Sequence, residues 1–279
     1  VSQEAFESDQ VKQKKIEASS GLFVLGDMNE LGEDAPKLHE GVARFLSDEG
    51  AREAIFIGRY AKHYENGFNA KCLTFPSVKE FATKIQEFGA QGITIHPRPD
   101  ERHIRYQDAR DLKNTVRTEY NIEGNPISSF VNLVLDVKPT QVTLVPDALD
   151  AITSNAGWDT HKHQSFLQEV IQEFQHHGIR TSIFIDTDLK LIEAAAKTGT
   201  DRIELYTEQF ATQFKKGNKE AIQPYTEAAL LAHELGLGIN AGHDLSLDNI
   251  EFFKKNILLI ILKEANNLFI NGIGIVLAK

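Results

Sequence analysis

Residues 180–208 read RTSIFIDTDLKLIEAAAKTGTDRIELYTE, and this stretch decides the fold class. A β-rich run at Thr181–Ile185 is followed by Leu189–Lys197, where apolar side chains recur at helical spacing. A second β-rich run follows at Arg202–Tyr206. Strand, helix and strand, separated by only a few residues, indicate a βαβ unit with parallel strands. The sequence therefore predicts an α/β protein.

The alternation of β-rich runs and helical stretches continues on both sides of this stretch. Further β-rich runs, with amphipathic stretches between them, lie at 92–96, 118–123, 141–145 and 237–240. These make six strands, whereas a closed (β/α)₈ barrel has eight, so the flanking sequence must supply two more. The candidates are Lys71–Phe75 for the first strand and either Leu258–Leu262 or Phe269–Leu277 for the eighth.

We therefore predict a (β/α)₈ TIM-barrel type fold whose first and eighth units are atypical or incomplete. The barrel is expected over residues 71–279, divergent after about residue 256. An extra N-terminal α/β segment is expected over residues 1–70.

The composition limits the partners of the chain. A net charge of −10 and a pI near 5.5 give no general attraction to nucleic acid or to an anionic membrane. The most apolar stretch, Ile257–Leu262, is too short to span a bilayer. The single cysteine, Cys72, excludes an internal disulfide framework and suits a reducing compartment. We predict a cytoplasmic protein that binds neither nucleic acid nor membrane.

In parallel α/β proteins the chemistry collects where the strands end. Those positions hold two histidines and several carboxylates, a set suited to proton transfer: His96, Glu123, Asp147, Asp186, Glu208 and His243. No lysine occupies such a position, which argues against a Schiff-base aldolase. Arg98 and Arg105 follow the first of these strands, and forked guanidinium donors suit phosphorylated substrates.

Each of these features also has a structural interpretation. A histidine at a strand end can cap backbone groups, and residues 97–103 can be a solvated charged loop. The histidine pairs at 161/163 and 176/177 lie on or beside predicted helices, where exposure is expected rather than a metal site. We predict no metal site.

Seven blocks of the sequence resemble the pyridoxine 5′-phosphate synthase family in order and approximate spacing. They cover about residues 77–256 and read GITIHPRPDERHIR (92–105), TEYNIEGNP (118–126), VTLVPD (142–147), TSNAGWD (153–159), RTSIFID (180–186), DRIELYTE (201–208) and GINAGHDLSLDN (238–249). The resemblance implies a (β/α)₈ barrel that forms a homo-oligomer, an octamer in the family.

The resemblance also implies an activity and its residues. It implies a transferase-type enzyme of vitamin B6 biosynthesis, which condenses 1-deoxy-D-xylulose 5-phosphate with 3-amino-2-oxopropyl phosphate to pyridoxine 5′-phosphate, phosphate and water, without a cofactor. Its partners would be these small phosphorylated substrates. Two proton acceptors, a proton donor and a group that stabilises the transition state would be His96, Glu123, His243 and Glu204, in that order. The deoxyxylulose phosphate would contact Arg98, His103 and Thr153, and the amino-ketone would lie beside Asp244.

The two ends of the chain depart from the family pattern. The family's first strand carries an Asn-x-[Asn/Asp]-[His/Lys] pattern and an arginine, and Lys71–Pro76 has neither. The family's eighth strand ends in a Gly-His pair that binds the second phosphate, and the sequence after Asn256 lacks it. The alternative is therefore a catalytically incompetent fusion or remnant protein. A different phosphate-handling barrel enzyme, such as an isomerase, shares the fold but not the motifs.

The N-terminal sequence resembles a different family. FVLGDMNELGE (23–33), His39 and AIFIG (54–58) are similar to the C-terminal domain of Mur ligases over about residues 20–88. The ATP-binding central domain of those enzymes has no counterpart in the sequence. The resemblance therefore implies an α/β segment and no ligase activity.

Overall fold

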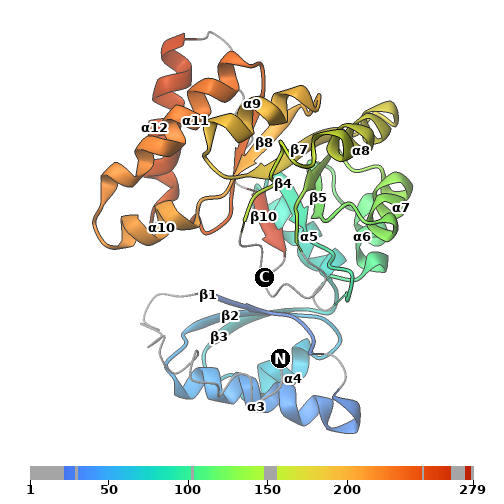
Figure 1. Cartoon of the computed structure of the whole chain (residues 1–279). Coiled ribbons are helices and arrows are strands. Elements are labelled where there is room, and N and C mark those ends of the chain that lie inside the picture. Colours follow the sequence, from blue (N-terminus) through green and yellow to red (C-terminus); the bar gives the residue numbers. More distant parts are fainter. Residues whose placement is uncertain are drawn as a thin grey trace. The chain divides into compact units, whose positions relative to one another are not determined.

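A computed structural model describes residues 22–28, 31–101, 104–147, 156–246, 248–264 and 274–277 of the 279-residue chain. The chain divides into two compact units, with the boundary between Phe88 and Gly89. Each unit contains a parallel sheet and helices, so the prediction of an α/β protein is confirmed (Figure 1). None of the helices in the described residues has the length and apolarity needed to cross a bilayer.

The first unit contains a three-stranded parallel sheet in the order β1 (Leu22–Leu25), β2 (Glu53–Ile57) and β3 (Lys71–Phe75). Its helical segments are η1 (Gly32–Asp34), α3 (Ala35–Asp48), α4 (Ala61–Gly67) and α5 (Val78–Glu87). Because side chains alternate along a strand, Ala54 and Phe56 of β2 share the face that packs on the helices. There the ring of Phe56 stacks on Tyr64 of α4, with 4.9 Å between centroids.

The strand at Lys71–Phe75 belongs to this first unit and corrects the predicted boundary. Its residues pair with β2, Leu73 opposite Ile55, so it does not begin the barrel as the division at residue 71 assumed. The physical reason is the short α4 connection, which returns the chain beside β2 and lets Cys72 pack against the core of the first unit. The second unit therefore begins at Gly89.

The second unit contains a seven-stranded, all-parallel sheet. Its order is β10 (Gly274–Leu277), β4 (Gly92–Ile95), β5 (Glu119–Gly124), β6 (Gln141–Leu144), β7 (Arg180–Ile185), β8 (Arg202–Leu205) and β9 (Gly238–Ala241). The helical segments are α6 (Tyr106–Lys113), α7 (Ser128–Val137), α8 (Gln164–His176), α9 (Leu189–Lys197), α10 (Glu208–Lys215), η2 (Lys219–Ile222), α11 (Gln223–Glu234) and α12 (Ile250–Glu264). Strand and helix alternate along most of this unit, as the sequence predicts.

The sheet curves as a barrel wall does but is incomplete, which confirms the predicted fold class (Figure 1). All six strands predicted between residues 92 and 240 are present. Of the two candidates for the last strand, Leu258–Leu262 lies within α12, and Gly274–Leu277 forms β10. β10 lies on the free side of β4, with Gly274 opposite Gly92. Among the described strands, β9 pairs with β8 alone, so β9 and β10 are the two edges.

Candidate active site

The first group of predicted site residues follows three neighbouring strands. His96 comes directly after β4, Glu123 is the penultimate residue of β5, and Asp147 follows β6. The register pairs Ile95 with Ile122, so the next residues, His96 and Glu123, are level in the sheet. Parallel strands all end at the same edge of the sheet, and this is what gathers residues so far apart in sequence.

The imidazole of His96 lies between two carboxylates. Its Nδ1 lies 3.9 Å from Oε2 of Glu123, and its Nε2 lies 3.5 Å from Oδ2 of Asp147. The three side chains are largely buried, with exposed fractions of 11%, 13% and 8% in the order His96, Glu123 and Asp147. Imidazole and carboxylate groups in contact, with little surrounding water, form an arrangement suited to proton transfer near neutral pH.

A cation lies beside this group. Nη2 of Arg98 lies 3.2 Å from Oδ2 of Asp147, and the arginine side chain is only 11% exposed. Nδ2 of Asn125 donates to the carbonyl oxygen of Asp147 at 2.6 Å, which ties the end of β5 to the end of β6. These residues line a pocket together with others from the strand ends and from α6 and α7: His96, Pro97, Arg98, Pro99, Tyr106, Gly124, Asn125, Phe130 and Asp147. A buried guanidinium in a pocket is suited to binding an anion.

The second group lies at the end of β9. Nδ1 of His243 contacts the carboxylate of Asp244, and Oγ1 of Thr207 donates to the carbonyl oxygen of His243. The imidazole packs edge-on against Tyr206, with 4.9 Å between ring centroids, and against Phe184 at 5.7 Å. Asp244 has φ 62°, in the left-handed region, a conformation in which a non-glycine residue is unusual and often functional.

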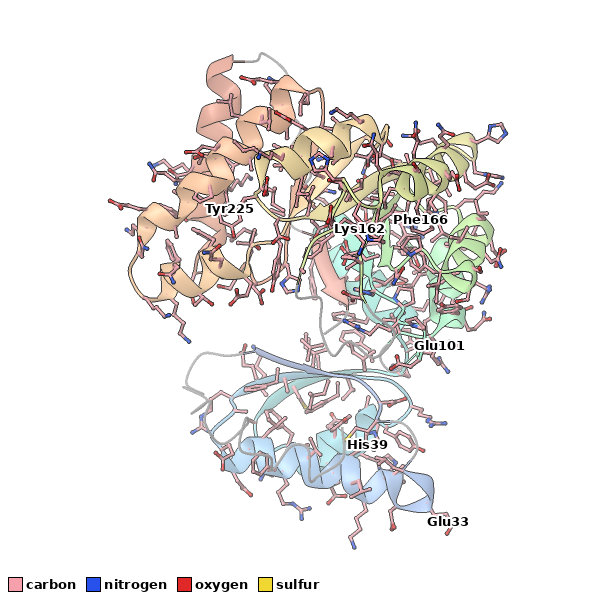
Figure 2. The ribbon with its side chains drawn as sticks, in the orientation of Figure 1. Glu33, His39, Glu101, Lys162, Phe166 and Tyr225 are labelled. Carbon is pink, nitrogen blue, oxygen red and sulfur yellow. The ribbon has the colours of Figure 1, made fainter. Side chains whose placement is uncertain are left out.

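Aromatic packing behind His243 keeps this loop in place. Tyr225 lies on α11 (Figure 2). Its hydroxyl donates to the carbonyl oxygen of Tyr206 at 3.0 Å. Burial raises the pKa of Tyr225 to about 12, so the hydroxyl keeps its proton and stays a donor throughout the neutral range. The hydrogen bond from α11 thus holds the backbone of Tyr206, the residue whose ring packs against His243.

Glu204 lies on β8, in register with Phe184 on one side and Asn240 on the other. It is 7% exposed. A Cβ added to Gly242 would lie 3.8 Å from Oε1 of Glu204, so the carboxylate lies beside the backbone that leads to His243. Glu204 therefore belongs to the β9 end of the site.

One known family matches the part of the chain that carries these residues. The model of the family described as pyridoxal phosphate biosynthesis protein PdxJ matches residues 68–266, which is more than half of the chain. The chain belongs to the PdxJ family. The match includes all six strands from β4 to β9 and every predicted site residue.

Individual PdxJ relatives are close in sequence. Proteins named pyridoxine 5′-phosphate synthase from Flavobacterium johnsoniae and Christiangramia forsetii are 70% and 65% identical to this chain over 189 residues, covering 68% of this chain and 80% of each relative. A third, from Parabacteroides distasonis, is 60% identical over 189 residues, covering 68% of this chain and 79% of the relative. Among solved structures, a dihydropteroate synthase from Stenotrophomonas maltophilia aligns with TM-score 0.44 and 11% identity over 88% of this chain and 93% of that one.

The structure places the described residues predicted for the PdxJ site in two groups, one after β4 to β6 and one at the ends of β8 and β9. His96, Glu123 and Arg98 meet around Asp147, and His243 and Asp244 are in contact with each other near Glu204. The remaining two, His103 and Thr153, lie outside the described residues. Within the described residues, His, Cys, Asp and Glu side chains form no group of three or more that could hold a metal ion.

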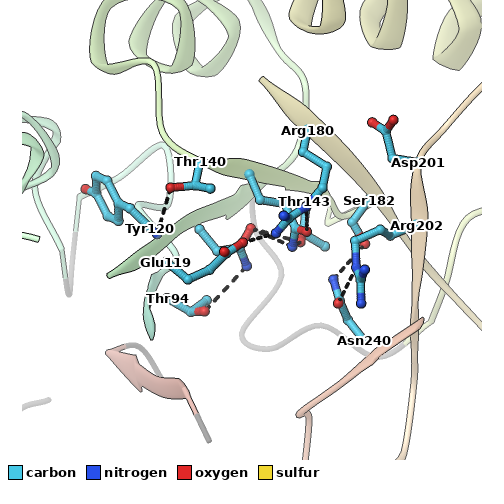
Figure 3. Close-up of polar contacts among 12 residues, drawn as sticks. Thr94, Glu119, Tyr120, Thr140, Thr143, Arg180, Ser182, Asp201, Arg202 and Asn240 are labelled. Carbon is cyan, nitrogen blue, oxygen red and sulfur yellow. Dashed lines mark hydrogen bonds and ion pairs between the residues drawn. The ribbon is translucent and has the colours of Figure 1, made fainter. Parts of the chain in front are cut away.

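A polar layer beneath the pocket was not predicted from the sequence. Side chains of β4 to β7 form a hydrogen-bonded network below His96 and Glu123 (Figure 3): Thr94, Glu119, Asn121, Gln141, Thr143 and Arg180. A second network joins β7, β8 and β9, where Nε of Arg202 donates to Oδ1 of Asn240 at 2.8 Å and Nδ2 of Asn240 donates to Oγ of Ser182 at 3.2 Å. Barrel interiors are usually filled by branched apolar side chains. Here the inward layer is polar.

The sequence does carry a signal for this layer. Polar residues occupy alternate positions of otherwise apolar strands, as in Asn121 and Glu123 or Gln141 and Thr143. Such alternation in a strand that is buried on both faces indicates a polar inward face. Burial lowers the pKa of the Arg180 guanidinium, and nearby Asp201 opposes this shift. Side chains of this kind are rarely buried without partners.

Proposed function

We propose that this chain is a pyridoxine 5′-phosphate synthase, which condenses 1-deoxy-D-xylulose 5-phosphate with 3-amino-2-oxopropyl phosphate to pyridoxine 5′-phosphate, phosphate and water. The observation that carries the proposal is the position of His96 between Glu123 and Asp147, beside the buried Arg98, in a chain of the PdxJ family. This arrangement unites proton acceptors with an anion-binding group, as two phosphorylated substrates require.

His96 and Glu123 are proposed as proton acceptors. Ring closure needs imine formation, loss of phosphate, carbon–carbon bond formation and dehydration, and each of these steps relocates a proton. A pair of groups 3.9 Å apart can accept protons at successive steps without leaving the pocket. Because both side chains are largely buried, bulk water does not compete for these protons.

Arg98 is proposed to bind the phosphate of the deoxyxylulose substrate, with His103 and Thr153. Support comes from its guanidinium, which Asp147 orients at 3.2 Å within the pocket. Fixing one substrate by its phosphate holds the reacting ketone at a defined distance from the bases.

His243 is proposed as the proton donor, with Asp244 beside the amino-ketone and Glu204 stabilising the transition state. The contact between Nδ1 of His243 and the Asp244 carboxylate supports this role, because a carboxylate on one ring nitrogen orients the imidazole and favours its protonated form. Asp244 thus has two proposed tasks, one toward its neighbour and one toward substrate.

The alternative is a catalytically incompetent fusion or remnant. It is favoured by the unpaired edges of β9 and β10 within the described strands, since the second phosphate would bind in this region of a closed barrel. It is also favoured by Lys71–Phe75, which lies in the first unit and supplies no amide or arginine to the site.

The test is turnover. The purified full chain is incubated with both phosphorylated substrates, and pyridoxine 5′-phosphate is detected by mass, with the E123Q variant and a full-length relative as controls. We expect product from the chain and the relative, and a loss of about 10²- to 10⁴-fold in E123Q. Absence of product from a folded chain, with the relative active, would reject catalysis and support the alternative.

We also propose that the enzyme works in the cytoplasm as a homo-oligomer. The first part is supported by the single cysteine, Cys72, which is a free thiol, since a chain with no internal disulfide suits a reducing compartment. For residues 20–88, the resemblance to part of a Mur ligase C-terminal domain stays a prediction.

A further inference from the structure

The inference concerns Asn121, which lies on β5 two residues before Glu123 and therefore on the same face of the strand. Its side chain is buried, and its Nδ2 donates to Oε1 of Glu123 at 3.2 Å. We infer that Asn121 is a positioning residue, whose amide fixes the Glu123 carboxylate with Oε2 toward His96. This inference rests on the proposed function, in which Glu123 accepts protons.

The orientation of the Asn121 side-chain amide is set by the hydrogen bonds that its oxygen accepts. Oδ1 of Asn121 accepts hydrogen bonds from Nε2 of Gln141 at 3.2 Å and from Oγ1 of Thr143 at 3.1 Å. A reversed amide would place its NH₂ group against the Gln141 donor and its oxygen against the Glu123 carboxylate. Both changes would be unfavourable, so the amide has one stable orientation.

Gln141 is oriented in turn by Arg180. Nε of Arg180 donates to Oε1 of Gln141 at 2.9 Å, and the same guanidinium pairs with Glu119 (Figure 3). Arginine has donors only, so the amide oxygen of Gln141 must face it, and the NH₂ group must face Asn121. Arg180, Gln141 and Asn121 thus form a chain in which each residue donates to the next, and the chain ends at the Glu123 carboxylate, which accepts. Hydrogen bonds aligned in this way strengthen one another.

The chain distinguishes the two oxygens of Glu123. Oε1 receives the Asn121 hydrogen bond, and Oε2 lies on the side of His96, 3.9 Å from its Nδ1. A donor to the carboxylate favours its ionised form, which is the form that accepts a proton. The titratable groups near Glu123 include His96, from the end of β4, and Asp147, whose Oδ2 lies 3.5 Å from Nε2 of that imidazole.

The first experiment is the variant N121D, which keeps the shape and the acceptor toward Gln141 but replaces the donor to Glu123 by an oxygen. We expect kcat to fall by about 10- to 100-fold with KM for either substrate changed by less than about threefold. We also expect the acidic limb of the kcat/KM profile to move to higher pH, because a second carboxylate beside Glu123 disfavours its ionised form. The control is N114D, at an exposed helix end. An active N121D with an unchanged profile would overturn the inference.

The second experiment does not require turnover. The ¹³C resonance of the Glu123 carboxyl is assigned in the wild-type chain by comparison with E123Q and followed against pH, together with the side-chain amide resonances of Asn121. In the wild-type chain we expect the Asn121 amide resonances to shift with the same pH midpoint as the Glu123 carboxyl, and in N121D we expect the Glu123 midpoint to lie at higher pH. A shared midpoint in a wild-type chain without turnover would support the inference and reject the proposed function. Asn121 resonances that do not follow Glu123 would overturn the inference, even where N121D does not fold.

Discussion

Nε2 of His96 lies 3.5 Å from Oδ2 of Asp147. The same carboxylate oxygen lies 3.2 Å from Nη2 of Arg98, so one acidic side chain holds both the proposed base and the proposed phosphate-binding cation. The sequence places Asp147 among the strand-end carboxylates, but the family resemblance assigns it no role. Its position couples the two tasks of the pocket.

We expect D147N to lower kcat/KM by about 10- to 150-fold, because a hydrogen bond between buried charged groups contributes about 1.5–3 kcal/mol. The amide keeps the shape of the side chain but not its charge, so KM for the deoxyxylulose phosphate should rise as Arg98 loses its orientation. Steady-state kinetics with each substrate varied in turn measures both effects.

The control for D147N is D136N, which removes the same charge from an exposed pair. Oδ2 of Asp136 lies 2.7 Å from Nε of Arg110, and both side chains are well exposed. An exposed pair of this kind contributes little to stability. D136N should have wild-type kinetics. A D147N enzyme that matches D136N would show that Asp147 orients neither neighbour.

The residues at the strand ends could be predicted from the sequence, because the ends of parallel strands lie at one edge of the sheet. Parallel strands end at one edge, so finding a β-rich run also locates the residue after it, and His96 and Glu123 meet as expected. The contacts within the polar layer were not predicted. Alternation along one strand indicates a polar face, but only the register of β5, β6 and β7 brings Asn121, Gln141 and Arg180 together.

The order of strands at the edges was also beyond the sequence pattern. Lys71–Phe75 and Gly274–Leu277 are both short apolar runs, and periodicity cannot say which sheet takes each. The partner is decided by tertiary contacts, such as those of Cys72 in the first unit. The apolar run at Leu258–Leu262 lies in α12. It was a strand candidate because a short apolar run is compatible with either a strand or a helix.

The stability of the first unit should depend on the protonation of His39. Nε2 of His39 accepts from the backbone N–H of Met28 at 2.9 Å, and its Nδ1 donates to the carbonyl oxygen of Ala35 at 2.5 Å. His39 lies on α3 (Figure 2) and its side chain is fully buried. Because its Nε2 accepts a hydrogen bond, the imidazole is neutral. Burial lowers its pKa below the ordinary 6.5, while the carbonyl of Ala35 and the charge of Asp27 oppose the shift.

The sign follows from the lowered pKa. The unfolded chain binds a proton at His39 more readily than the folded one, so stability is complete above pH 6.5 and is lost as the pH falls from 6.5 toward the folded pKa. Hydrogen-exchange protection of residues 22–28 and 35–48, corrected for the intrinsic pH effect, should decrease over this range. In H39Q the decrease should be smaller, and in H161Q, an exposed histidine of the second unit, it should be unchanged. Equal acid sensitivity in H39Q and wild type would assign the effect to another group.

The Arg180–Glu119 pair should stabilise the second unit as a pair and not as two separate charges. Its side chains are 31% and 24% exposed, and burial lowers the pKa of Arg180. Removing one partner leaves a partly buried charge, so E119Q and R180Q should each lower the free energy of unfolding by about 1–2 kcal/mol.

The double variant measures the coupling. E119Q/R180Q should lose less than the sum of the single variants, by about 0.5–2 kcal/mol in urea unfolding. The exposed Arg110–Asp136 pair serves as the control, with a coupling below about 1 kcal/mol. Additive losses at residues 119 and 180 would mean that the pair is screened like the exposed one.

Gly157 should not tolerate a side chain, because of a close approach to β7. A Cβ at this position would lie 2.4 Å from Cα of Ile185 and 2.5 Å from the backbone N of Asp186. The backbone N–H of Gly157 also donates to Oδ2 of Asp186 at 2.9 Å, and that of Trp158 donates to the carbonyl oxygen of Phe184 at 2.9 Å. G157A should therefore push the segment away from the strand and lower the free energy of unfolding by about 1–3 kcal/mol.

Gly41 provides the opposite case. It lies in the middle of α3, exposed, with nothing within 4 Å of an added Cβ, so G41A should stabilise its unit by about 0.5–1 kcal/mol. Thermal unfolding of the two variants should shift in opposite directions. Because Trp158 follows Gly157 directly, its fluorescence should respond to G157A and not to G41A. A G157A chain with wild-type stability and fluorescence would contradict the close approach between Gly157 and Ile185.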